Sequence, residues 1–267
     1  MRLNHTAAIL LRQFYLMRGS MARLLPLFAW VAVDILLWGF ITRYLNSVAA
    51  ADFNFVPVLL GAVLMWDFFT RVMQGVTTSF LEDVWSRSFL NLFATPLTIS
   101  EYVSGLVLTS IVTSTLGLVT MLVLATTVFG LSYLSFGLAF IPFLLILFLF
   151  GIALGIAGAA MVLRLGPASE WFIWPIPAMV SPFVGVFYPL STLPQWMQYI
   201  AHLLPPSYVF EGMRAVILGQ GFSTGRLLWG ICLAGFYIVL AGGFFTHVYR
   251  YAVRTGLLAR YSAESAG

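Results

Sequence analysis

The sequence carries very little charge and contains no lysine. Only 8% of its 267 residues are charged, whereas soluble domains carry roughly 25%. All 13 basic residues are arginines, which excludes a phosphate-loop lysine and a Schiff-base lysine from this chain. The single cysteine, Cys232, excludes an intrachain disulfide. With so few charges, most of the surface must face something other than water.

The sequence contains long apolar runs between its few charged residues. Apolar residues make up 61% of the chain, and no charged residue occurs in 102–163, 171–210 or 227–249. About 20 apolar residues in a helix cross a bilayer core about 30 Å thick. The first run is therefore long enough for two spans, and the last for one. The sequence predicts an all-α integral membrane protein with about six transmembrane helices, with five and seven as the alternatives.

The six expected spans form a single transmembrane domain over residues 1–267, with longer connecting segments at 81–96 and 191–225. They cover roughly residues 26–45, 56–80, 102–129, 138–163, 171–190 and 227–249. Prolines interrupt the fifth. In the fourth, Gly151, Gly155 and Ala159 recur every four residues, a spacing that predicts a close helix-packing face rather than a ligand site.

The arginines predict the orientation of the chain, because basic residues near span ends favour the cytoplasmic side. With both termini in the cytoplasm, nine arginines lie inside and three lie outside. The inside positions are 2, 12, 18, 23, 87, 164, 250, 254 and 260, and the outside positions are 43, 214 and 226. This bias predicts that both termini are cytoplasmic.

Residues 1–23 have the pattern of an amphipathic helix. Leu3, Leu10 and Phe14 fall at helical spacing, with Arg12 opposite them, which suits a helix lying in the cytoplasmic membrane interface. The segment is not typical of a secretory signal, which needs a short apolar core and a small-residue cleavage site. The alternative is an ordinary basic turn before the first span.

Three charged residues fall inside the expected spans: Asp34, Asp67 and Arg71. Facing lipid, each would cost roughly 2.5 kcal/mol or more, so we expect them in the bundle interior. Asp67 and Arg71 are four residues apart and can pair on one helix face. Asp34 and Arg71 lie at similar depth, so a bridge between the first two spans is also feasible. We interpret the cluster as a structural clamp, with an ion or proton relay as the alternative.

The segment 81–96, LEDVWSRSFLNLFATP, is longer than a turn between two spans needs to be. Glu82 and Asp83 at its start favour a helix beginning there. Trp85 and the apolar residues after it form a stripe, and Pro96 ends the segment. The pattern predicts a capped amphipathic helix on the cytoplasmic side, with either an interfacial or a docking role.

The segment 191–225 is too apolar for a solvated loop, yet prolines and glycines break it. Two helices of about ten residues fit, split at Pro205-Pro206, with Ser207 placed to cap the second. Each would span about half a bilayer, which suits an external re-entrant pair.

Two charged residues lie in the second of these helices. Glu211 and Arg214 are three positions apart, so they share one helix face. They either form a local structural pair or, together with Tyr188, gate an exit path on the outer side.

Two stretches of the sequence resemble a known family. FATPLTISEYVSGLVL, residues 93–108, is similar to the segment after the coupling helix in ABC type-2 permeases. FYPLSTLPQWMQYIAHLLPPSYVFEGMRAVI, residues 187–217, is similar to the signature that follows their fifth span. Length and span layout match over nearly the whole chain. The chain therefore resembles the transmembrane subunit of an ABC-2 class exporter.

The resemblance implies a homodimer in the cytoplasmic (inner) membrane of a bacterium, bound to a separate ATP-binding-cassette ATPase subunit. That partner would bind ATP and Mg, so this chain would be no enzyme, would hold no cofactor or metal and would bind no nucleic acid. The missing lysine agrees, because the chain cannot supply a phosphate-binding loop. The coupling helix would present five residues to the ATPase: Glu82, Asp83, Trp85, Arg87 and Asn91.

The implied function is outward transport of an amphiphilic, lipidic, drug-like or glycan substrate. Aromatic residues make up 16% of the chain, and those near the outer surface suit either sugar stacking or an ordinary interfacial belt. A proton-coupled secondary transporter using Asp34, Asp67 and Arg71 is the alternative. A membrane-embedded enzyme is disfavoured, because the three histidines are far apart in the sequence and no metal-ligand spacing occurs.

Overall fold

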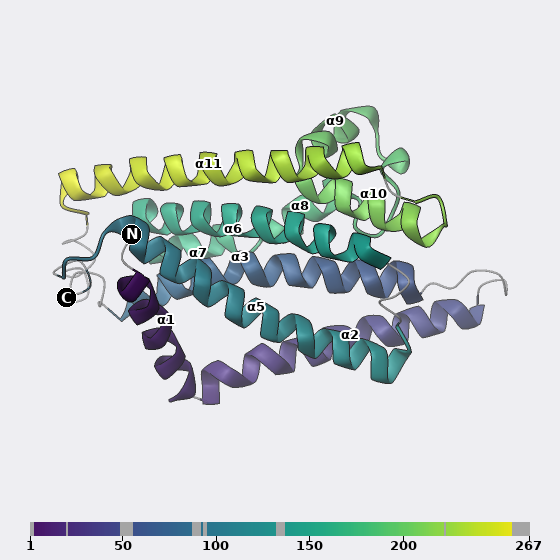
Figure 1. The fold of residues 1–267 in the computed structure, drawn as a ribbon, viewed down its shortest axis with the longest axis horizontal. Coiled ribbons are helices and arrows are strands. Elements are labelled where there is room, and N and C mark those ends of the chain that lie inside the picture. Colours follow the sequence, from purple (N-terminus) through teal and green to yellow (C-terminus); the bar gives the residue numbers. More distant parts are fainter. Residues whose placement is uncertain are drawn as a thin grey trace.

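The computed structural model is helical wherever it has regular structure. It describes residues 3–19, 21–48, 56–86, 92, 95–131, 137–221 and 223–257. Five long helices run along the molecule (Figure 1): α2 (Met21–Val48), α3 (Gly61–Trp85), α5 (Ile99–Phe129), α6 (Phe140–Leu165) and α11 (Thr224–Thr255). The π-helical turn η1 (Val56–Leu60) extends α3. These ranges contain no strand, so the all-α prediction is confirmed.

The bundle has two distinct ends. The first helix, α1 (Leu3–Arg18), crosses the direction of the long helices at one end (Figure 1), where α3 finishes and α5 begins. The short helix α9 (Gln195–Leu203) lies at the opposite end, near the start of α11. We call these the α1 end and the α9 end. Helix α1 packs mainly against α5 and touches the start of α2.

Five helices within the described ranges are long and apolar enough to cross a membrane, where six were expected. The expected fifth span is broken into η3 (Pro167–Ser169), α7 (Glu170–Ile173) and α8 (Ile176–Val184). Proline lacks the backbone N–H that a helix ladder needs, and Pro175 sits at the break while Pro182 lies inside α8. The broken segment still leads from the α1 end toward the α9 end (Figure 1).

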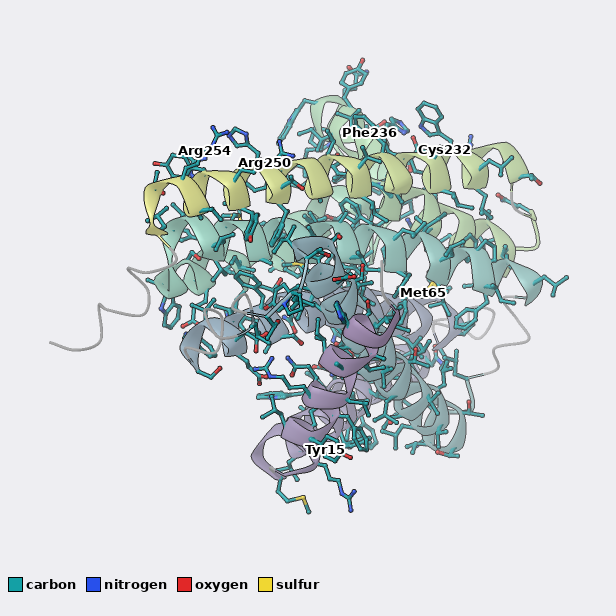
Figure 2. The ribbon with its side chains drawn as sticks, turned by 60° about the vertical axis from the view of Figure 1, so that its left-hand side comes forward. Tyr15, Met65, Cys232, Phe236, Arg250 and Arg254 are labelled. Atoms are coloured by element: carbon teal, nitrogen blue, oxygen red, sulfur yellow. The ribbon has the colours of Figure 1, made fainter. Side chains whose placement is uncertain are left out.

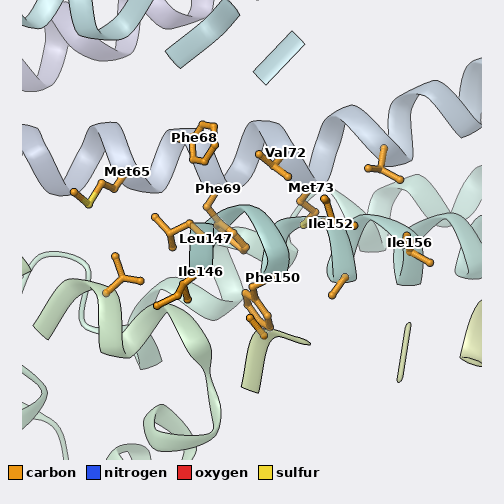
Figure 3. Close-up of a cluster of buried hydrophobic side chains, with 14 of the residues drawn as sticks. Met65, Phe68, Phe69, Val72, Met73, Ile146, Leu147, Phe150, Ile152 and Ile156 are labelled. Atoms are coloured by element: carbon orange, nitrogen blue, oxygen red, sulfur yellow. The ribbon is translucent and has the colours of Figure 1, made fainter. Parts of the chain in front are cut away.

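The core forms where α6 packs between α3 and α11, while α3 also packs against α5. Figure 3 shows Phe69 and Val72 of α3 facing Leu147 and Phe150 of α6. The rings of Phe69 and Phe150 stack with centroids 5.6 Å apart and planes 12° from parallel. Such aromatic contacts supply more apolar area per side chain than aliphatic ones.

Small residues let α6 approach α3 closely, as the four-residue spacing predicted. A Cβ atom at Gly155 would lie 2.8 Å from the Met73 carbonyl oxygen and 2.8 Å from Val76 Cβ, and one at Gly151 would also meet Val72 below 3 Å. The hydroxyl of Thr77 donates to the Gly155 carbonyl oxygen at 3.1 Å. The packing interpretation of this face is therefore confirmed.

Local signals fix both ends of α5. Thr98 and Glu101 form a capping box at the start of α5, with the Glu101 carboxylate accepting from the Thr98 backbone N–H at 3.1 Å. Gly130 ends the helix at φ 68°, a left-handed conformation that favours glycine.

Figure 2 shows Cys232 and Phe236 on the outer side of α11, and both are exposed. That apolar face suits contact with lipid.

The expected pair of short helices is present at the α9 end. Helix α9 and α10 (Pro205–Ile217) meet at Leu204, and the two prolines open α10. The expected capping role of Ser207 is wrong. Its hydroxyl donates to the carbonyl oxygens of Ala201 and Leu204, both at 2.7 Å, and so closes α9 instead. The prolines have no N–H to cap, which leaves the hydroxyl available for the preceding helix.

The packing of α6 on α3 generates a stability prediction. We expect Gly155→Ala to lower the free energy of unfolding by about 1–3 kcal/mol, because the added methyl group overpacks a rigid backbone contact. Gly243→Ala in α11 is the matched control, since a Cβ there meets nothing within 4 Å. It should be neutral or stabilising by up to about 1 kcal/mol. Equilibrium unfolding in mild detergent measures both, and equal effects would contradict the close packing.

Candidate functional site

Charged side chains of the described region gather at three places along the bundle. One group lies midway along α2 and α3, one at the α1 end, and one at the α9 end. The first two are joined by a polar groove, defined below by its lining. The sequence predicted the charged residues of the first and third groups, whereas the group at the α1 end also contains residues that it did not predict.

Midway along the bundle, Asp67 and Arg71 form an ion pair. Arg71 Nε donates to Asp67 Oδ2 at 2.8 Å, and both side chains are mostly buried. This is one of the two expected pairings. The other expected pairing, between Asp34 and Arg71, is not formed: both residues are described, and no ion pair within 4 Å joins them. Asp34 instead faces the same cavity and interacts electrostatically with Asp67 and Arg71.

These charges line a groove of about 540 Å³, which we call the polar groove. Helices α1, α2, α3 and α5 and the turn after α7 supply its walls. Its lining residues are Gln13, Met17, Trp30, Asp34, Asp67, Thr70, Arg71, Gln74, Gly75, Thr78, Ser79, Glu82, Thr109, Thr113, Ser114 and Trp174. A cavity of this size is within the range that takes drug-sized ligands.

The groove was not predicted as such, although α3 carries a signal for it. Between Asp67 and Glu82 the polar and small residues recur every three or four positions, so they form one stripe on an otherwise apolar helix. The opposite face of α3 carries Phe69 and Val72, which pack on α6. Treating each intramembrane charge singly misses this continuous polar face.

At the α1 end, Asp83 joins three helices. It is completely buried. Arg12 of α1 donates from Nη2 to Asp83 Oδ1 at 2.6 Å, and the Tyr102 hydroxyl of α5 donates to Oδ2 at 2.8 Å. A charge-assisted contact of this kind is roughly twice as strong as a neutral hydrogen bond. The interaction therefore fixes α1 to the adjoining ends of α3 and α5.

A second contact holds the start of α1. His5 Nδ1 lies 3.1 Å from Glu101 Oε2, and the Glu101 carboxylate also caps α5 through Thr98. The sequence indicated an amphipathic α1 lying in the membrane interface and named no partner for Arg12. In the structure Arg12 contacts the buried Asp83 of α3. A contact of that range in sequence has no local signal.

The expected docking segment differs from its prediction at its start. Glu82 and Asp83 were expected to open a new helix, but α3 continues through Trp85, so both lie in its last turn. Acids at a helix C-terminus oppose the helix dipole, and the Arg12 contact offsets this for Asp83. Trp85 is 51% exposed at the helix end. Arg87 and Asn91 lie outside the described residues.

At the α9 end, Glu211 and Arg214 pair with each other, which is one of the two expected arrangements. Arg214 Nη2 donates to Glu211 Oε1 at 2.8 Å, and that oxygen also accepts from the Leu190 backbone N–H at 2.9 Å. The pair holds the chain that follows α8 against α10. That chain turns at Gly185, whose φ of 63° favours glycine.

Tyr188 lies in the same turn but is not part of the ion pair. Its hydroxyl donates to the Pro182 carbonyl oxygen at 2.7 Å. A second cavity of about 640 Å³ borders Glu211, with Gln198, His202 and Arg226 among its lining residues. The structure therefore brings two of the three expected gate residues, Glu211 and Arg214, together beside a cavity at the α9 end. Across the described ranges, no cluster of three or more His, Cys, Asp or Glu residues could hold a metal ion.

Comparison with known proteins gives one family match. The sequence model described as ABC-2 type transporter matches residues 5–218. This range contains all three charged groups and ends immediately after α10. No curated protein matches the chain.

The contact at the α1 end predicts an energetic coupling. In a double-mutant cycle of Arg12→Ala and Asp83→Asn, we expect the two residues to be coupled by about 1–2 kcal/mol of unfolding free energy. The Arg12 side chain is 28% exposed, so the value should be below that of a fully buried pair. Equilibrium unfolding in detergent provides the four free energies. Strictly additive effects would rule out a direct contact.

The mid-bundle pair predicts which carboxylate compensates Arg71. Arg71→Gln should lower the unfolding free energy by about 2–3 kcal/mol, because Asp67 is left buried without its partner. Adding Asp67→Asn should recover much of this loss, and adding Asp34→Asn should recover less. Unfolding midpoints of the three variants test the order. Equal recovery by both neutralisations would mean that Arg71 is shared between the two acids.

Proposed function

The chain belongs to the ABC-2 type transporter family, and on that premise we propose that it carries a substrate outward across the cytoplasmic membrane of a bacterium. The chain is the multi-pass permease component, and permeases of this family pair with ATPase subunits. The proposed substrate is an amphiphile, drawn from lipidic, drug-like or glycan compounds. ATP hydrolysis in a separate subunit supplies the energy, and a second copy of this chain completes the permease.

The polar groove is the observation that carries this proposal. A purely structural membrane protein would have no use for a polar cavity of about 540 Å³ among its spans, because polar groups within the membrane are costly. The groove combines charged groups with Trp30, Met17 and Trp174. Such a mixture suits a molecule with both a polar and an apolar part.

The α1 end is proposed to face the cytoplasm. Arg12, Arg18, Arg164, Arg250 and Arg254 lie on helices near that end, and Figure 2 shows the last two close to the end of α11. Basic residues favour the cytoplasmic side of a span. On this orientation α1 lies in the inner interface, both termini are cytoplasmic, and α9 and α10 form the external segment.

Coupling to the ATPase is proposed to pass through the end of α3. The partner would contact four residues there: Glu82, Trp85, Arg87 and Asn91. The buried Asp83 holds α1 and α5 to the end of α3. A push on this end would move three helices together, because buried charge-assisted bonds resist separation. All three of those helices, α1, α3 and α5, line the polar groove.

The external pair is proposed to act as a gate. The Glu211–Arg214 pair holds the turn after α8 in place, next to the cavity of about 640 Å³. Releasing the turn from Glu211 would free a segment that is already broken by prolines. Tyr188 moves with this turn, since its hydroxyl is bonded within the same segment.

A proton-coupled transporter is the competing function, and one experiment separates the two. The chain is purified from its native membrane in mild detergent and its companions are identified. A stoichiometric ATPase subunit, with transport in vesicles that requires ATP, supports the proposal. A chain that arrives alone and transports with only a proton gradient contradicts it.

Trp85 provides a more local test of coupling. We expect Trp85→Ala to lower substrate-stimulated ATPase activity of the assembled complex by about tenfold, because exposed tryptophans often dominate binding interfaces. Trp229→Ala is the matched control, since Trp229 is similarly exposed but lies at the α9 end of α11. Membrane insertion should be unchanged in both. Normal stimulation in Trp85→Ala would exclude this helix end as the docking point.

A further inference from the structure

We propose that the polar groove binds an amphiphilic organic cation that carries a hydrogen-bond acceptor. This inference rests on the proposed export function and adds the chemical class of the substrate. Three independent features of the groove lead to it: its charge balance, its unpartnered polar atoms and its exposed indoles.

The charge balance of the groove is negative. Three carboxylates line it, from Asp34, Asp67 and Glu82, against the single guanidinium of Arg71. The formal net charge of the lining is therefore −2. Arg71 is already committed to Asp67 at 2.8 Å, whereas Asp34 makes no hydrogen bond or ion pair with any described residue. A bound cation would supply the counter-charge that Asp34 lacks in a region of low dielectric.

Two buried polar atoms in the lining have no hydrogen-bond partner. They are Gln13 Nε2 and Ser114 Oγ, and their residues are 2% and 1% exposed. Buried polar groups are almost always bonded in folded proteins, so each such atom calls for a partner. The amide nitrogen of Gln13 can only donate. The ligand must therefore offer an acceptor, such as an ester, ether or carbonyl oxygen.

Two indole rings complete the site. Trp30 and Trp174 line the groove and are 64% and 44% exposed. Trp30 lies one turn before Asp34 on α2, so the ring and the carboxylate share a helix face. A flat organic cation would stack on the indole while its charge faces the carboxylate, which is the geometry that cation–π contacts favour.

The groove also has a direction. On α3 it extends from Asp67 to Glu82, which are fifteen residues apart and so about 22 Å along the helix. Glu82 and Met17 lie toward the α1 end, the proposed cytoplasmic side. An amphiphilic cation would enter there and move inward to Asp34 and Asp67.

A pair of matched dyes tests the charge requirement on the unaltered protein. Rhodamine 6G is a flat cation with an ester, and its free acid has the same ring system but no net charge at neutral pH. Fluorescence anisotropy with the purified full chain in detergent measures both. We expect the ester to bind about tenfold more tightly than the acid. Equal affinity, or no saturable binding of the ester, would overturn the proposal.

Two substitutions shift the groove charge in opposite directions. Asp34→Asn should weaken rhodamine 6G binding about tenfold, while Arg71→Gln should strengthen it, because it leaves Asp67 without its counter-charge. General damage to the fold would weaken both. Glu170→Gln is the control, since Glu170 lies on α7 outside the lining. Weaker binding in both groove variants would contradict the inference.

Gln13→Leu tests the hydrogen-bond donor separately. We expect this substitution to weaken rhodamine 6G binding several-fold. The free acid, whose binding is much weaker, should still bind in the same groove. Unchanged binding would show that the ligand needs no hydrogen-bond acceptor and would overturn that part of the proposal. The dye measurements need no ATPase subunit. An ATPase partner without cation binding therefore defeats this inference alone, and cation binding without an ATPase defeats only the proposed energy source.

Discussion

A charge placed in the hydrocarbon region of a membrane must find a partner or a polar cavity, and the whole bundle follows from how α3 meets that demand. One face of α3 is apolar and lies against the glycines of α6, so the helix is held firmly in the core. The other face is a polar stripe from Asp67 to Glu82. Because the two faces are opposed, the close packing on one side keeps the charges pointing into the groove on the other.

Helix α3 also connects the parts that a transport cycle must coordinate. Its middle carries the Asp67–Arg71 pair, and its last turn carries the buried Asp83, which holds α1 and α5. A helix transmits displacement along its axis with little compression, because every turn is hydrogen-bonded to the next. The groove and the proposed docking point therefore belong to one rigid element, while the proposed gate at the α9 end consists of short helices broken by prolines.

The sequence was most informative about features that depend on neighbours in the chain. Apolar length predicted the long spans, the four-residue spacing predicted the Asp67–Arg71 pair, and the glycine spacing predicted the α6 packing face. One failure is local, since the Ser207 hydroxyl closes α9 instead of capping α10. The other failure at a helix end involves distant residues. Arg12 of α1 contacts Asp83 of α3, with α2 and η1 between them in the sequence. That contact stabilises an acid in the last turn of a helix, although local rules place acids in the first turn. The expected fifth span fails for a local reason, because its prolines leave helices too short to cross a membrane.

The contacts of α1 impose an order on biogenesis. Helix α1 is synthesised well before its ion-pair partners, since Asp83 lies in the last turn of α3 and Glu101 in the first turn of α5. Until both have been synthesised, α1 has only lipid headgroups and water for its basic side chains. Docking of α1 therefore requires that α2 and α3 are already inserted and that α5 has begun, so this helix reports the correct assembly of the segments that follow it.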